Sequence, residues 1–239
     1  PEDRQAIESL DRLYGETGRH YDLLQVLERE VELSQATSET VALKHRIGRL
    51  WESELGDLAR AVEAFREALE LDPAHGPTLE ALDRIVHGPT EPVLAASVLE
   101  PIFETAGEWE KLIDVYEVMV RHAEDGYRRV ELLHRIADLD ESQLGRAPEA
   151  FRAFGRALRE DAANERTLAE LERLAGATGA WVDLAGLYDE EIKKLLDPSR
   201  QVEMLLRAAR VWEEEIAHLG DPDATGPTVA DAVDRAIAT

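Results

Sequence analysis

No cysteine occurs among the 239 residues, and aromatic residues make up only 5% of the chain. Without cysteine there is no disulfide framework, no thiolate zinc site and no thiol nucleophile. Lys and Arg are also scarce, at 27 residues against 51 Asp and Glu, and the formal net charge is -24. A charge of this sign repels nucleic acid and anionic membrane surfaces. The sequence therefore excludes thiol redox chemistry and predicts no nucleic-acid partner.

Long hydrophobic runs are missing too. No apolar segment approaches the roughly 20 residues that a membrane span needs, and residues 1–6 are too polar for a signal peptide. We therefore expect no membrane insertion and a cytoplasmic location. The chain begins with Pro1 and stops within the helix-like stretch 229–238. This indicates a fragment of a longer protein, and for that reason a periplasmic location stays open.

The residues that are abundant favour helices. Apolar residues make up 44% of the chain and charged residues 33%, a balance that suits two-sided helices better than a sheet sandwich. The basic residues are mostly arginine, and the only lysines are Lys44, Lys111, Lys193 and Lys194. Together with abundant alanine, this bias indicates a GC-rich bacterial source.

The sequence repeats itself internally. The segment 45–73 returns 89 residues later as 134–161, and a looser third copy runs through 205–237. A second pattern consists of Gly, an aromatic residue or His two positions on, and apolar residues five, eight and nine positions on. It starts at Gly18, Gly107 and Gly179, with separations of 89 and 72 residues. These spacings predict stacked copies of one helical unit.

Apolar periodicity and turn residues predict the helices. We expect them at 3–16, 20–34, 38–55, 58–71, 76–87, 92–105, 109–123, 126–143, 147–160, 164–177, 181–195, 199–218 and 227–238. The first separation is longer than the second, and its extra residues lie within 84–102. There, residues 87–92 interrupt a stretch that forms a single helix in the third copy. This insertion predicts an added helix, which Pro101 should kink or shorten.

Small residues mark the faces on which these helices pack. Ala61, Ala64 and Ala68 follow one another at i, i+3 and i+7, so they share one side of a helix. A neighbouring backbone can approach that side closely, and Phe65 fills the space beside it. Such faces are buried only when antiparallel hairpins stack.

At this point the chain resembles the tetratricopeptide repeat family. The resemblance rests on Gly48, Trp51, Ala61, Phe65, Ala68 and Pro73. The match requires one extra residue at 55–57. It fails over 79–106, and it fails at 161–162, where the Pro that closes the family's repeat is missing. It implies an all-α, right-handed solenoid of stacked antiparallel hairpins. Residues 1–239 would form one domain, with sub-units at about 3–75, at 76–161 with a split helix near 84–102, and at 162–239, truncated at its C-terminal end.

The sequence contains only weak candidates for catalytic or metal-binding motifs. His45 and His134 match across the repeat, but neither has a second His or Cys near it in its helix. Residues 221–226 begin like a calcium loop, yet Ala232 stands where the bidentate Glu belongs. The carboxylate runs 189–191 and 213–215 suit solvated helix faces rather than an acid–base pair. We expect no catalytic residue, no cofactor and no metal, and hence no enzyme.

In the tetratricopeptide family, the first helix of each hairpin lines a concave groove. The resemblance therefore implies a non-catalytic protein-binding scaffold, whose partner would contact His45, Arg49, Glu52, His134, Asp138 and Glu141. The acidic excess favours a basic or amphipathic helical partner. Two alternatives stay open: a regulatory or substrate-recruiting arm of a larger enzyme, and a structural component of a bacterial envelope or motility assembly. The sequence does not specify an oligomeric state.

Overall fold

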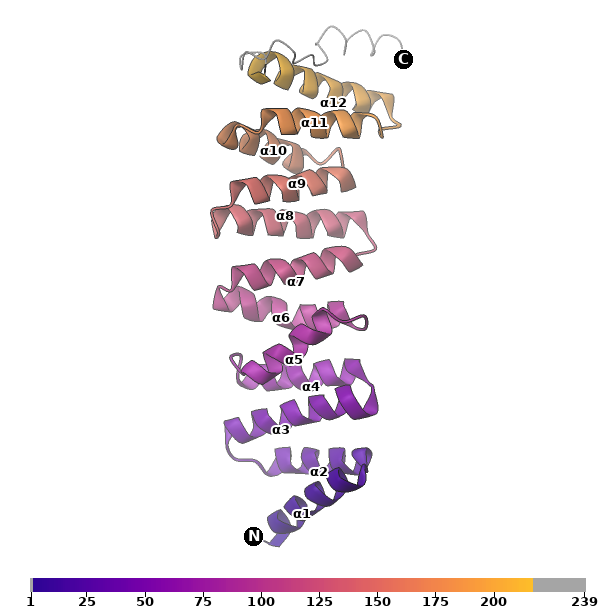
Figure 1. Ribbon diagram of the computed structural model, residues 1–239, viewed down its shortest axis with the longest axis vertical. Coiled ribbons are helices and arrows are strands. Elements are labelled where there is room, and N and C mark those ends of the chain that lie inside the picture. The colour runs from indigo at the N-terminus through magenta and orange to yellow at the C-terminus, as the bar shows by residue number, and fades with distance from the viewer. Residues whose placement is uncertain (1, 217–239) are drawn as a thin grey trace. The chain divides into compact units, whose positions relative to one another are not determined.

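The structure is a computed structural model that describes residues 2–216. These residues form α-helices and two π-helical segments joined by short turns, and they contain no strand (Figure 1). The α-helices are α1 (Glu2–Thr17), α2 (His20–Leu33), α3 (Thr37–Leu50), α4 (Leu58–Leu71), α5 (Gly76–Val86), α6 (Pro92–Ala106), α7 (Trp109–His122), α8 (Gly126–Ser142), α9 (Ala147–Glu160), α10 (Glu165–Thr178), α11 (Trp181–Ile192) and α12 (Pro198–Arg210). The π-helical segments η1 (Trp51–Leu55) and η2 (Val211–Ile216) continue α3 and α12. The all-α prediction is confirmed.

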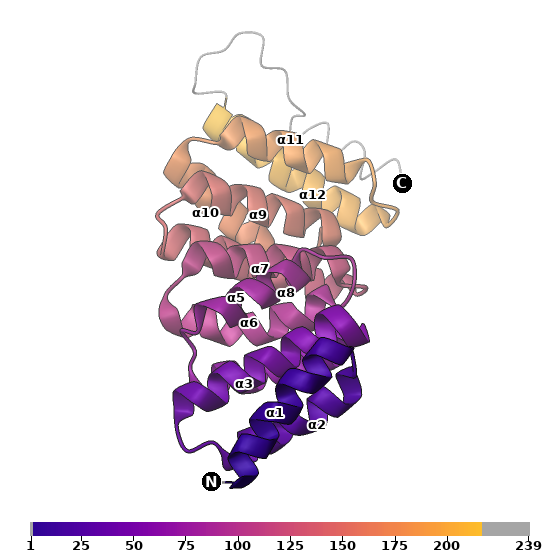
Figure 2. The ribbon, with the colours of Figure 1, turned by 60° about the horizontal axis from the view of Figure 1, so that its bottom comes forward.

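The chain divides into two compact units. Unit 1, Pro1–His122, contains α1 to α7, and unit 2, Ala123–Thr239, contains α8 to α12. Within each unit, helices that are consecutive in sequence pack against each other, most extensively α3 with α4 and α8 with α9. Figure 2 shows α1 beside α2 at the start of unit 1. Stacking of helix hairpins is thus present in both units. The three predicted sub-units and the right-handed superhelix stay predictions.

The contact between α3 and α4 is built on small residues and one aromatic ring. Ala61, Phe65 and Ala68 are completely buried. The ring of Phe65 lies against the backbone of Gly48, where an added Cβ would be only 2.3 Å from a ring carbon. In unit 2 the matching residues, 89 positions later, are Ala137 and Phe154, and both are buried. The predicted interior faces of these helices are therefore correct.

Helix α3 continues into a short π-helical segment before the turn at 55–57. Residues Trp51–Leu55 are π-helical, and π-helical turns accommodate one more residue than α-helical turns. Gly56 then adopts a left-handed conformation with φ 69°, and the Asp57 amide donates to the Trp51 carbonyl at 3.0 Å. Such a glycine closes a helix without the steric cost that a Cβ brings. The π-helical continuation itself was not predicted.

The insertion between the first and second copies forms the added helix that the sequence predicts. Helix α5 ends at Val86, and α6 begins at Pro92 after a turn in which Glu91 has a φ of 56°. Pro suits the first turn of a helix because its missing N–H has no partner there in any case. Helix α6 continues past Pro101 to Ala106. Pro101 therefore does not shorten this helix, and the alternative, a kink, stays a prediction.

Helix boundaries agree with the expected ranges within a few residues, and α4 and α9 match them at both ends. The predicted helix 227–238 and the calcium-like stretch 221–226 lie outside the described residues. Among residues 2–216, every helix is too short or too polar to cross the hydrocarbon core of a bilayer.

Candidate functional site

His134 is a packing residue rather than a surface residue. Its side chain is buried, at 6% exposure, and its ring centroid lies 5.3 Å from that of Phe154. Nε2 is 2.7 Å from the hydroxyl of Thr167, which is completely buried on α10. That hydroxyl donates to Oδ1 of Asn164, so it accepts from an N–H at Nε2 of His134. The expectation that His134 is left free to line a groove is wrong.

His45 has a similar environment in unit 1. Its Nδ1 lies 3.0 Å from the hydroxyl of Thr78, which is also completely buried, and its ring packs on Phe65 and His75. Burial lowers the pKa of both His45 and His134, because it disfavours the charged imidazolium. The two histidines thus hold the first helix of one hairpin to the next hairpin as neutral hydrogen-bonding groups.

Arg49 and Glu52 lie on the side of α3 and η1 that faces α5. The exposed Arg49 has its Nε 3.6 Å from Oε2 of Glu52, and Arg84 of α5 has its Nη2 3.5 Å from Oε1 of the same carboxylate. Oε2 of Glu52 is shielded from solvent and has no hydrogen-bond partner among the described residues. Glu52 therefore lies between two arginines and is only partly accessible.

Asp138 and Glu141 form the corresponding part of unit 2. Both carboxylate oxygens of Asp138 accept from Nη2 of Arg166, at 2.9 and 2.7 Å. Glu141 accepts from two guanidinium nitrogens of Arg173, one of them at 2.8 Å, and these bonds lower the pKa of Glu141. Both arginines belong to α10. The carboxylates that the sequence assigned to a partner already have partners within the protein.

Three arginines of these pairs, Arg84, Arg166 and Arg173, were not identified as site residues from the sequence, although a signal for two of them existed. Arg84 and Arg173 stand 32 residues after Glu52 and Glu141 respectively, and the two pairs are separated by the 89-residue repeat. An ion pair between the first helices of successive hairpins therefore recurs in both units. Arg49 and Asp138 occupy matching positions with opposite charge, so the two units present different patterns there.

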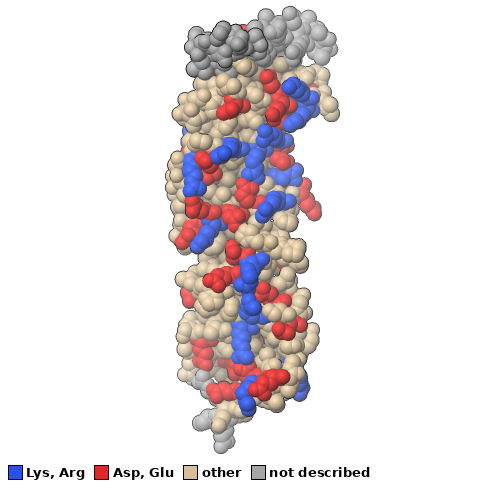
Figure 3. Space-filling model, in the orientation of Figure 1, with Lys and Arg blue, Asp and Glu red and all other residues tan. Residues whose placement is uncertain are grey.

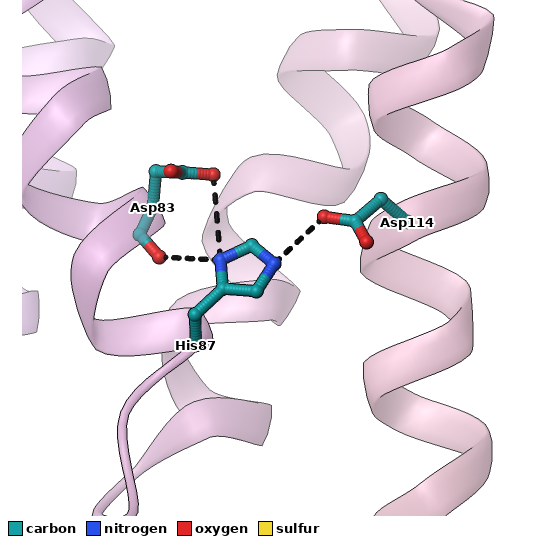
Figure 4. A group of neighbouring side chains, drawn as sticks. All are labelled: Asp83, His87 and Asp114. Carbon is teal, nitrogen blue, oxygen red and sulfur yellow. Dashed lines mark hydrogen bonds and ion pairs between the residues drawn. The ribbon is translucent and has the colours of Figure 1, made fainter.

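A further cluster, Asp83, His87 and Asp114, joins the end of α5 to α7 (Figure 4). Nδ1 of His87 lies 2.9 Å from the backbone carbonyl of Asp83, and Nε2 lies 2.9 Å from Oδ2 of Asp114. Neither acceptor can donate a hydrogen bond. Both contacts are therefore hydrogen bonds at the same time when both ring nitrogens of His87 are protonated. The backbone hydrogen bond and the Asp114 charge raise the pKa of His87.

This cluster is better described as an ion pair than as a metal centre. The carbonyl of Asp83 occupies Nδ1 of His87, and Figure 4 shows Asp83 and Asp114 reaching opposite edges of the ring. The carboxylates of Asp83 and Asp114 and one ring nitrogen of His87 lie within 4.8 Å of one another, and all three residues are exposed. Exposed acidic groups often gather in this way without an ion.

A scan against protein-family models finds no match to the chain, and a search of curated proteins finds no relative. Among solved structures, the chain is similar to the TPR2AB-domain:pHSP90-complex of yeast Sti1. The identity is 15%, the TM-score is 0.31, and the alignment covers 97% of this chain and 85% of that one. A likeness at this level assigns neither a family nor a function.

Proposed function

We propose that the chain is a non-catalytic protein-binding scaffold whose partner lies along the first helices of the hairpins. The observation that supports this proposal is the recurrent ion-paired surface of α3 with α5 and of α8 with α10. In unit 2, Arg173 is held by Glu141 and also by Glu170, whose Oε2 lies 2.7 Å from its Nε. Charged groups fixed in this way lose little conformational entropy when a partner binds.

Four of the six sequence-predicted residues remain in this proposal. Arg49, Asp138 and Glu141 have side chains that are 46%, 52% and 34% exposed, and Glu52 is accessible at 19%. His45 and His134 have structural roles instead, because their rings are packed between helices. We therefore assign partner contacts to the charged residues and not to the histidines.

The chemistry of the partner follows from the charges. The excess of Asp and Glu attracts a basic or amphipathic segment at long range. At short range the surface carries both positive and negative side chains. Figure 3 shows Lys and Arg interleaved with Asp and Glu on the visible face. A partner that carries basic side chains with some acidic ones complements such a surface, and its binding should weaken as salt is added.

Site-specific photo-crosslinking tests this proposal. A benzophenone amino acid is placed at Arg49 or Asp138 and, as a control, at Glu63, which is an exposed residue of α4. The proteins are irradiated in the cells that produce them, and the adducts are identified by mass spectrometry. We expect one protein to be captured from positions 49 and 138 but not from 63. No adduct, or adducts from position 63 alone, would reject the first-helix surface.

A further inference from the structure

Helix α1 exposes an apolar face that its counterparts in the repeat bury. The separations of 89 and 72 residues place α10 161 positions after α1, and each of the two helices is followed by a glycine with positive φ. Leu10 and Leu13 of α1 are 38% and 48% exposed, whereas the matching Leu171 and Leu174 of α10, which packs on α9, are completely buried. Leu82 of α5, which packs on α4, has the same place in the pattern and is also completely buried. The face that a preceding helix covers in these copies is therefore open on α1.

An arginine on this face matches one that binds a neighbouring hairpin in unit 2. Arg173 of α10 binds Glu141 of α8 in addition to Glu170 of its own helix. The matching residue of α1 is Arg12, which lies 3.7 Å from Glu16 of its own helix and has a side chain that is 76% exposed. A guanidinium carries five N–H donors. Arg12 can therefore bind a second carboxylate from another hairpin, as Arg173 does.

The matching carboxylate position occurs again at η2, in unit 2. Helix α12 repeats α8 72 positions later, and an aspartate caps the N-terminus of each, Asp125 for α8 and Asp197 for α12. In this register Glu213 of η2 matches Glu141, the residue that binds Arg173. Glu213 is exposed. Unit 2 thus presents a carboxylate where the repeat places the partner of an arginine such as Arg12.

A second matched pair is polar inside unit 2 and apolar at α12 and α1. His134 of α8 and Thr167 of α10 share a hydrogen bond between buried side chains. The residue that matches His134 is Leu206 of α12, which is 38% exposed, and the residue that matches Thr167 is Ala6 of α1, which is also exposed. Two apolar side chains need no hydrogen-bond partner, and burying them against each other is favourable. The two surfaces therefore fit each other in apolar character as well as in charge.

We propose that α1 of one copy of this chain packs on α12 and η2 of a second copy, as α10 packs on the hairpin of α8 and α9. Arg12 would bind Glu213 of the second copy, and Ala6 would lie against its Leu206. The place of α9 would fall to the predicted helix 227–238, which lies outside the described residues. The contact joins two different surfaces, so it generates rings or open chains of copies rather than two-fold dimers.

Sedimentation velocity tests whether the copies associate through these surfaces. The parent protein, measured from about 1 to 100 µM, should show a sedimentation coefficient that rises with concentration. Leu13→Glu on α1 and Leu206→Glu on α12 should each weaken the association at least about tenfold, because each buries a charge in an apolar contact. Val182→Glu is the matched control, since it makes the same change at a residue that is 56% exposed elsewhere in unit 2. The control should stay within about twofold of the parent protein.

A charge exchange shows which two groups meet. Arg12→Glu and Glu213→Arg should each weaken self-association about threefold to tenfold, because each brings like charges together at the joint. An equimolar mixture of the two variants should recover the association of the parent protein, since every joint between unlike variants pairs opposite charges. Arg29→Glu, an exposed charge reversal on α2, should stay within about twofold of the parent. Circular dichroism verifies that each variant is folded.

Three results would overturn the proposal. The first is a parent protein that sediments as a monomer at every concentration. The second is dissociation by Leu13→Glu but not by Leu206→Glu, which would mean that α1 pairs with α1 of the second copy. The third is a mixture of Arg12→Glu and Glu213→Arg that associates no better than either variant alone, because Arg12 and Glu213 would then not meet across the joint.

Discussion

Glu141 of α8 and Arg173 of α10 are joined by two hydrogen bonds, one at each carboxylate oxygen, so this ion pair links the first helices of two successive hairpins. Its counterpart in unit 1 is the longer contact between Glu52 and Arg84, at 3.5 Å. Charged side chains that line the first helices therefore hold neighbouring hairpins in register while remaining partly exposed.

The first prediction concerns the strength of this pair. Glu141→Gln should lower the free energy of unfolding by about 0.5–1 kcal/mol, because both partners are partly exposed and solvent screens their attraction. A double-mutant cycle with Arg173→Gln, measured by urea unfolding, should give a coupling of similar size that shrinks in high salt. Coupling near zero at low salt would show that the pair does not form in solution.

The second prediction concerns the aromatic residue between α8 and α9. Phe154→Ala should cost roughly 3–5 kcal/mol, since the side chain is 1% exposed and its removal leaves a cavity. Phe65→Ala should behave alike in unit 1, whereas Glu63→Ala on the exposed face of α4 should change little. Urea unfolding measures all three, and similar midpoints for the Phe and Glu variants would contradict the assigned helix faces.

The third prediction separates the two copies of the hairpin. Gly48→Ala should destabilise unit 1 by about 1–3 kcal/mol, because the new methyl group would overlap the Phe65 ring. Unit 2 already has a buried Ala137 at the matching position, so the repeat itself accepts a methyl group there. Adding Phe65→Leu should recover part of the loss by making room. A Gly48→Ala protein as stable as the parent would show that α3 and α4 are less closely packed than described.

The fourth prediction is a pH dependence with two opposite signs. The pKa of His87 is raised in the folded state, so its contribution to stability is present below the unfolded pKa and is lost as pH rises through the folded one. The pKa of His134 is lowered, so its contribution is present above the unfolded pKa and is lost as pH falls. NMR titration of the ring protons should show His87 titrating above the usual histidine range and His134 below it. The reverse order would contradict both assigned environments.

The helices could be predicted from the sequence because apolar period and turn glycines are local signals. The expected range 58–71 coincides with α4, and Gly56 adopts the left-handed conformation that such a helix end requires. The π-helical segment Trp51–Leu55 could not be predicted in the same way. A shift in backbone hydrogen bonding leaves the apolar pattern of so short a segment almost unchanged.

The candidate site was predicted less well, because each residue's environment depends on a helix about 30 residues away. The sequence pattern around His134 predicts an exposed side chain. In the structure the side chain is buried, and the buried hydroxyl of Thr167 on α10 explains why an imidazole is tolerated, because it provides a hydrogen-bond partner. Similarly, the sequence shows Asp138 and Glu141 as acidic residues, but in the structure Arg166 and Arg173 pair with their carboxylates. Local sequence shows the charge of a residue but not its partner.

The fifth prediction tests the scaffold proposal most directly, with a charge exchange on unit 2. Asp138→Arg combined with Arg166→Asp keeps an ion pair between α8 and α10 but reverses the charge that each helix presents. Stability should change by less than about 1 kcal/mol. Affinity for the protein captured by crosslinking at Asp138, measured by calorimetry at several salt concentrations, should fall about tenfold or more and lose part of its salt dependence. An unchanged affinity in a variant of unchanged stability would contradict binding along the first helices.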